Sequence, residues 1–215
     1  MTARSRTSAL CSALALAAAL CGCTADVAGT AVRPAPGIDE DSRSPVDVDA
    51  VLLDRSQLQA ITGAGDDLTP VPGMRSKTPV DIDVLLGTVA RQCQWVFAET
   101  QVFGPEVEEF HKSTYQSPQR GGLLSQAAAG YRDPQTAQAA FAELVARIHT
   151  CDQSRSGGAL VGELSTTADS VRTRPGDCGR DYRIKSAVLV EVTFCAMPAT
   201  VPDIVMANIL ANVPG

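Results

Sequence analysis

Four cysteines in the second half of the chain are the residues with the clearest chemistry. They are Cys93, Cys151, Cys178 and Cys195, and no two consecutive ones are closer than 17 residues. A zinc site usually needs cysteines or histidines in close pairs, so this spacing favours disulfides over a metal. An even number of cysteines is typical of an exported protein, and two disulfides are therefore predicted.

Cys23 follows a segment with the features of an export signal. A basic start precedes an apolar run from Ala9 to Leu20, which is too short to span a bilayer unaided. The following Leu20-Cys21-Gly22-Cys23 resembles a bacterial lipobox, whose last cysteine is lipidated. The alternative is ordinary signal cleavage near Ala25. The lipobox predicts a signal peptide over residues 1–22 and a lipid anchor on Cys23.

The two histidines, His111 and His149, are the natural candidates for acid–base or metal chemistry. His149 is expected near the end of a long helix, where the helix dipole favours a cation. His111 follows an acidic run, residues 106–109, and a solvated helix face is favoured over a metal site. No serine-hydrolase, zinc-protease or phosphate-loop motif appears. We predict no catalytic residues, no metal and no cofactor.

The net charge of the chain argues against nucleic acids as partners. Without residues 1–22 the chain has 16 basic and 24 acidic residues, a net charge of −8. Nucleic-acid phosphates and anionic headgroups repel such a surface, so no nucleic-acid function is expected. The densest basic segment, residues 172–185, is interpreted as a solvated hairpin, with an anion-binding patch as the alternative.

One long amphipathic helix must position much of this chemistry. Asp133 is a good N-cap and Pro134 suits the first turn. The apolar residues that follow recur every three or four positions, and Cys151 continues their stripe. The stripe needs a covering surface, and the strand predicted over residues 92–98 offers Cys93, Trp95 and Phe97 on one face. Cys93 is then placed to reach Cys151.

A hairpin is predicted over residues 178–184 and 188–195. A two-residue turn at Ser186-Ala187 would set Cys178 opposite Cys195, at a separation that a disulfide can close. Strict pairing would also place Asp181 beside a row of valines, so a β-bulge is predicted.

The remaining elements complete an α+β fold, an antiparallel β-sheet with helices packed on it. Short helices are predicted within residues 51–63 and 104–110, a strand over residues 123–131, and a C-terminal helix from Val201 that buries Ile204, Val205, Ile209 and Val213. Residues 23–45 are predicted to be a lipidated flexible tether and residues 46–215 the folded domain. Tyr115 and Tyr131 lie near strand ends and are candidates for lining a ligand cleft.

Three segments of the chain together resemble the PknH-like extracellular domain family. They are Cys93-Gln-Trp-Val-Phe, Tyr131-Arg-Asp-Pro through to Cys151, and Cys178 through to Val190-Glu-Val-Thr-Phe-Cys195. The resemblance covers residues 47–215. It implies an antiparallel sheet flanked by helices, pairing of the first cysteine with the second and of the third with the fourth, and an exposed cleft for an unidentified ligand. In that family, the domain is the external sensor of a mycobacterial membrane Ser/Thr kinase, and similar domains occur on mycobacterial lipoproteins.

We therefore expect a lipoprotein with a non-catalytic sensor domain at the outer face of the cytoplasmic membrane. Its partners would be the membrane, through Cys23, and an unknown small molecule or lipid bound in an apolar cleft with a few inward polar groups. A protein-interaction module for envelope partners is the alternative, and it predicts a flat patch instead. An envelope hydrolase would require His111 or His149 beside a nucleophile or metal.

Overall fold

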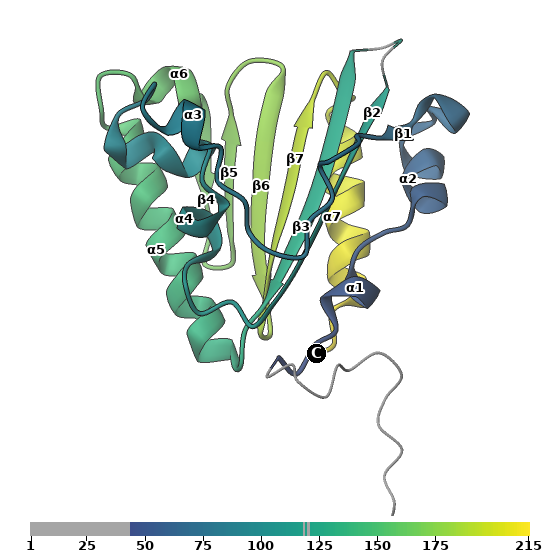
Figure 1. The fold of residues 1–215 in the computed structure, drawn as a ribbon, viewed down its shortest axis with the longest axis horizontal. Helices are drawn as coiled ribbons and strands as arrows, with labels where there is room; N and C mark the ends of the chain where they lie inside the picture. The colour runs from purple at the N-terminus through teal and green to yellow at the C-terminus, as the bar shows by residue number, and fades with distance from the viewer. Residues whose placement is uncertain (1–43, 118, 120) are drawn as a thin grey trace, which may run out of the picture. The chain divides into compact units, whose positions relative to one another are not determined.

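The computed structural model describes residues 44–117, 119 and 121–215, and the predicted signal peptide, Cys23 and most of the predicted tether lie outside this range. The described residues form a seven-stranded antiparallel sheet in the order β1-β2-β3-β7-β6-β5-β4 (Figure 1). Its strands are β1 (Thr69–Pro70), β2 (Glu109–Ser117), β3 (Gly122–Gly130), β4 (Glu163–Thr166), β5 (Ser170–Arg174), β6 (Cys178–Lys185) and β7 (Val188–Cys195).

Helices cover both faces of this sheet (Figure 1). One face carries α5 (Pro134–Asp152) together with the short elements α3 (Asp83–Leu86), η2 (Arg91–Val96), α4 (Glu99–Phe103) and α6 (Gly157–Val161). The other face carries α1 (Val48–Val51), α2 (Arg55–Thr62), η1 (Gly65–Asp67) and α7 (Thr200–Asn212). The predicted fold class, an antiparallel sheet with packed helices, is confirmed.

Strand β7 lies in the centre of the sheet and shows why two cores form. Successive side chains of a strand point to opposite faces. Val188, Val190, Val192 and Phe194 pack with α7 and the N-terminal helices in one core, whereas Leu189 belongs to the core under α5. Glu191 and Thr193 share the face of Leu189 and are not covered by that helix.

Helix α5 follows its local sequence signals. The Asp133 carboxylate accepts a hydrogen bond of 2.7 Å from the backbone N–H of Thr136, and Pro134 occupies the first turn. The predicted stripe is buried as far as Cys151, except for Val145, which is half-buried. Cys93 bonds to Cys151 and Cys178 to Cys195, so both predicted disulfides are present.

Two predicted elements are wrong. Residues 91–96 form a 3-10 helix rather than a strand, although Cys93 and Trp95 are still buried against α5. The helix predicted over residues 104–110 is also absent, because residues 109–117 pair with β3 along nine residues. The helix lies earlier, at α4, and Gly104 ends it with a φ of 75°. The pairing of β2 with β3 in a hairpin therefore prevails over the helical preference suggested by the acidic run.

The hairpin of β6 and β7 is regular, and the predicted bulge is wrong. Cys178 pairs with Cys195 and Lys185 with Val188, which leaves Ser186 and Ala187 as the turn. Asp181 does lie opposite Val192 and is fully buried. Its carboxylate is matched there by Arg174, at 2.7 Å, and by Arg172, at 3.4 Å. Ion pairing, which pattern reasoning did not include, removes the need for a bulge.

The C-terminal helix α7 is present, and its buried side differs from the prediction at one residue, Ile204. Val205 and Ile209 are buried, whereas Ile204 is 43% exposed. The ammonium of Lys185 donates to the carbonyls of Leu210 and Val213 and so satisfies the end of the helix. Across the described residues, no helix combines the length and the apolar character needed to cross a membrane.

Candidate functional site

A cavity of about 330 Å³ opens on the sheet face that carries α5, but no residue of that helix lines it. We call it the sheet cavity. Its walls come from residues 73–82, η2 and α4, and their large side chains are apolar: Met74, Val80, Ile82, Trp95, Val96, Phe97 and Val102. Ligand sites of soluble proteins usually measure about 300–1,000 Å³ and have mostly apolar walls. The sheet cavity is at the lower end of this range.

The floor of the sheet cavity is polar, and four adjacent strands build it. Apart from Leu123 of β3, the floor residues are Lys112 of β2, Ser125 of β3, Arg180 of β6, and Glu191 and Thr193 of β7. Thr193 pairs with Ser125 on one side and Arg180 on the other, and Ala127 lies between Lys112 and Glu191. Burying polar groups is unfavourable unless they are bonded. Inward positions of central strands are normally apolar, so this concentration requires an explanation.

Two of the charges around the cavity satisfy each other. The ammonium of Lys112 forms an ion pair with the carboxylate of Glu99 from α4. The same carboxylate accepts a hydrogen bond of 2.8 Å from the backbone N–H of Val80. Burial raises the pKa of Glu99, and the nearby Lys112 only partly opposes this effect. The pair fastens the wall of the cavity to its floor.

Arg180 and Glu191 are less completely matched. The guanidinium of Arg180 donates to the Val96 carbonyl at 2.7 Å and lies 5.7 Å from the centre of the Trp95 ring. The carboxylate of Glu191 accepts the Thr193 hydroxyl at 2.5 Å. Within the described part of the chain, neither Arg180 nor Glu191 forms an ion pair. A cation and an anion with spare hydrogen-bonding capacity therefore remain on the floor.

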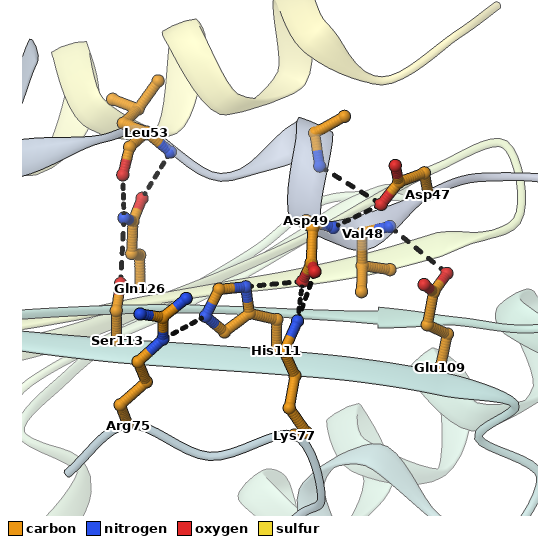
Figure 2. A network of polar contacts seen from close by, with 11 residues as sticks. Asp47, Val48, Asp49, Leu53, Arg75, Lys77, Glu109, His111, Ser113 and Gln126 are labelled. Atoms are coloured by element: carbon orange, nitrogen blue, oxygen red, sulfur yellow. Dashed lines mark hydrogen bonds and ion pairs between the residues drawn. The ribbon is translucent and has the colours of Figure 1, made fainter. Parts of the chain in front are cut away.

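A second polar cluster lies on the opposite face of the sheet, around His111 (Figure 2). Its Nδ1 is 2.7 Å from an Asp49 oxygen, although the N–H is not aligned for a hydrogen bond. Its Nε2 accepts a hydrogen bond of 3.3 Å from Arg75, and Lys77 pairs with the same Asp49. The ring thus carries its proton on Nδ1. The predicted solvated helix position for His111 is wrong, because it is a mostly buried strand residue.

Burial lowers the pKa of His111, and the positive charges of Lys77 and Arg75 add to this effect against the opposing charge of Asp49. For Asp49, burial alone would raise the pKa, but the hydrogen bond from Lys77 and the charge of His111, which is protonated in the acid range where Asp49 titrates, keep it below its ordinary value. The cluster is therefore built from a neutral histidine, an ionised aspartate and two cations.

A cavity of about 410 Å³ adjoins this cluster, and Tyr115, His111 and Arg75 are among its lining residues. The buried amide of Gln126 fixes the neighbouring backbone. It accepts from the N–H of Leu53 at 3.0 Å and donates to the carbonyl of Leu53 at 2.6 Å (Figure 2). This bonding holds the segment after α1 on the sheet.

Residues 74–77 connect the two sites. Ser76 pairs with Lys112 through two backbone hydrogen bonds of 3.1 and 2.9 Å, so this segment extends the sheet beyond β2. Met74 and Ser76 line the sheet cavity, whereas Arg75 and Lys77 contact the His111 cluster. One short stretch is therefore a wall of the cavity and a part of the cluster.

The two tyrosines predicted as cleft residues have different positions. Tyr115 lines the second cavity, and binding of a ligand there stays a prediction. Tyr131 is fully buried, and its hydroxyl donates to the carbonyl of Phe103 at 2.7 Å. It cannot line a cleft in this structure, because the strand end it occupies is covered by α4 and α5 rather than open.

The charged floor of the sheet cavity escaped sequence reasoning. Glu191 and Thr193 alternate with valines in their strand, and such alternation is ordinarily a sign of a solvent-facing side. Arg180 was grouped with a basic segment expected to be solvated. The register of four strands is needed to see that these side chains converge.

The histidines show no catalytic arrangement among the described residues. His111 contacts Asp49 and Arg75, while His149 lies 3.4 Å from the hydroxyl of Thr166 at an exposed position. Neither is paired with a serine or cysteine nucleophile there. No group of three or more potential metal ligands occurs in the part of the chain that the structure describes.

Comparison with known proteins gives a match over nearly all of the described chain. The model of the PknH-like extracellular domain matches residues 44–212. No curated protein matches. Among solved structures, the extracellular domain of PknH from Mycobacterium tuberculosis is similar in fold, with a TM-score of 0.55 and 13% sequence identity over 76% of this chain and 92% of that one. The chain therefore belongs to the PknH-like extracellular domain family.

Proposed function

We propose that the protein is a lipid-anchored lipoprotein whose domain binds a small ligand in the sheet cavity and acts as a non-catalytic sensor in the cell envelope. Membership of an extracellular domain family supports export. The lipobox-like sequence ending at Cys23 supports the anchor, at the outer face of the cytoplasmic membrane.

The sheet cavity is the observation that carries the ligand-binding proposal. Apolar walls with a few inward polar groups are the usual form of a small-molecule site. Here the polar groups come from four paired strands and α4, and the disulfide Cys93–Cys151 ties η2, a wall of the cavity, to α5. A site on such a frame loses little conformational entropy when a ligand binds.

Native mass spectrometry of the full-length protein purified from envelope tests this function. We expect an additional mass that disappears on denaturation and is absent from a variant whose cavity is filled by Val80→Trp. Val80 is 48% exposed at the cavity wall, so the larger ring is expected not to disturb folding. A protein without any bound mass, or with equal mass in both forms, would contradict ligand binding in this cavity.

A protein-interaction module is the second candidate, and one observation favours it. Met74, Val80, Ile82 and Val84 are exposed large apolar residues in one short stretch, and Val84 is 84% exposed. Exposed apolar patches often mark binding surfaces for proteins. Replacing Val84, which does not line the cavity, with Asp would abolish capture of an envelope protein but leave a small ligand bound.

A further inference from the structure

We infer that the sheet cavity takes a neutral amphiphile, with a hydroxyl-bearing polar group against the floor and its apolar part toward residues 74–82. This inference rests on the proposed ligand-binding function and names the class of ligand. It follows from the distribution of charge on the floor, the hydrogen-bonding capacity left there, and the apolar wall above.

The charges that line the cavity balance. Lys112 and Arg180 contribute two positive charges, and Glu99 and Glu191 contribute two negative charges. A ligand ammonium would gain from Glu191 but would be repelled by Arg180 and Lys112. A ligand carboxylate or phosphate would gain from Arg180 but would be repelled by Glu191 and Glu99. Because charges interact strongly where water is excluded, a charged group of either sign is disfavoured.

The hydrogen-bonding groups require both a donor and an acceptor from the ligand. The carboxylate of Glu191 has four lone-pair directions, and the Thr193 hydroxyl uses one of them. The guanidinium of Arg180 has five N–H donors; the Val96 carbonyl receives one, the buried hydroxyl of Tyr182 interacts with the same guanidinium, and further donors remain. A hydroxyl group can donate to Glu191 and accept from Arg180 at the same time. Neighbouring hydroxyls, as in a sugar or a polyol, could satisfy both residues together.

The wall above the floor predicts the apolar part of the ligand. Met74, Val80 and Ile82 line the cavity and are also 39%, 48% and 45% exposed. Exposed apolar side chains at the mouth of a cavity gain free energy when an apolar group covers them. The floor is polar and the mouth apolar, so the polar end of the ligand is innermost.

The chain contains a built-in reporter for this binding. Trp95 is its only tryptophan and lines the sheet cavity. We would titrate the purified protein with octyl glucoside, octylammonium and octanoate, each below its critical micelle concentration, and follow tryptophan fluorescence. These probes have alkyl tails of nearly the same length and carry neutral hydroxyl-bearing, cationic and anionic polar groups, respectively. The expected result is saturable binding of octyl glucoside, at least about tenfold tighter than either charged probe.

A change of charge on the floor should change this preference. Glu191→Gln keeps the shape of the side chain and one acceptor oxygen, replaces the other oxygen by an amide donor, and gives the lining of the cavity a net positive charge. Octanoate should then bind at least about tenfold more tightly than it does to the original protein. Glu143→Gln is the matched control, because Glu143 lies on the exposed side of α5 and does not line the cavity. It should leave the affinities of all three probes unchanged.

A second pair of variants tests the orientation without touching the buried charges. Ile82 lines the cavity and is the N-cap residue of α3, where Asp is favoured, so Ile82→Asp is expected to fold. It should weaken octyl glucoside binding about tenfold or more, because it places a charge against the tail. Val84→Asp, in the same segment but outside the cavity, should have no effect.

The outcomes separate this inference from the proposed function. Tighter binding of octylammonium or octanoate by the original protein would overturn the neutral class while leaving ligand binding intact. Equal effects of Ile82→Asp and Val84→Asp would overturn the orientation. If none of the three probes binds, the amphiphile class is wrong, and the proposed function is then judged by the ligand that co-purifies from envelope. Absence of that ligand as well would remove both.

Discussion

Asp181 is a fully buried charge in the middle of β6, a strand whose apolar side chains belong to the core under α5. Its Oδ1 is 2.7 Å from Arg174, whereas its Oδ2 is 3.4 Å from Arg172 without hydrogen-bond alignment. Both arginines belong to β5, the neighbouring strand. Removing one partner of a buried ion pair leaves an uncompensated charge and is strongly destabilising.

Asp181→Ala should therefore lower the free energy of unfolding by about 3 kcal/mol, measured by urea denaturation at neutral pH. Asp203→Ala provides the control, because Asp203 also pairs with Arg172 but is about half exposed. Exposed pairs contribute at most about 1 kcal/mol. Equal losses for the two variants would show that burial does not strengthen the role of Asp181.

His111 makes stability depend on pH in a definite direction. The pKa of its ring is lower in the folded protein than the ordinary value of 6.5, chiefly because of burial. The unfolded chain therefore takes up the proton first as the pH falls below about 6.5. The contribution of neutral His111 to stability is present above this value and is lost as the pH falls through the folded pKa.

Replacing His111 by Gln tests this sign. The amide can approach Asp49 and accept from Arg75, but it does not titrate. The loss of unfolding free energy between pH 7.5 and 5.5 should be smaller in His111→Gln than in the original protein. Burial raises the pKa of Glu99 and Glu109, so these groups act with the opposite sign, and the difference between the two proteins isolates His111. Equal losses would contradict the assignment.

Among the elements, those with local signals were predictable from the sequence. Helix α5 has its cap, its proline and its stripe within one stretch, so no distant contact is needed to define it. Helix α2 is similar, with a capping box at Asp54 and a left-handed Gly63 at its end. Strands β6 and β7 follow from alternation and from the two cysteines that face each other.

Elements decided by tertiary contacts were not predictable. The alternation of Cys93, Trp95 and Phe97 is compatible with a strand, but these residues lie in or next to η2, between α5 and the cavity. The apolar residues there are buried or half-buried because they pack against other elements on two sides, not because they alternate along a β-strand. The candidate site is the extreme case, because Lys112, Arg180 and Glu191 come from three separate strands and only their register unites them.

The disulfides allow a prediction about the elements that they join. The Cys93–Cys151 bond links η2 to the end of α5 across 58 residues, and Cys178–Cys195 closes 17 residues within one hairpin. Loop entropy predicts losses of about 4 and 3 kcal/mol when each pair is replaced by Ala. Urea denaturation measures both. A larger loss for the hairpin pair would mean that packing, not loop length, sets the difference.

At the scale of the whole molecule, the anchor remains a prediction of the sequence. Cys23→Ala should release the protein from the membrane fraction into the soluble fraction of the producing cell. Stable attachment needs more than one acyl chain, and the substitution removes the residue on which the proposed chains are carried. The released protein should retain both disulfides and its ligand-binding properties. Unchanged membrane retention, with no lipid mass on the N-terminal peptide of the original protein, would refute lipidation.

Residues 74–77 contact the sites on both faces of the sheet, so the two sites are not structurally independent. Their backbone is fastened to β2 at Ser76, and their alternate side chains reach both sides. Because Arg75 contacts His111 and Lys77 contacts Asp49 of α1, we expect a ligand that displaces Met74 to alter these contacts as well. Occupancy of the sheet cavity would then affect the position of α1 on the other face.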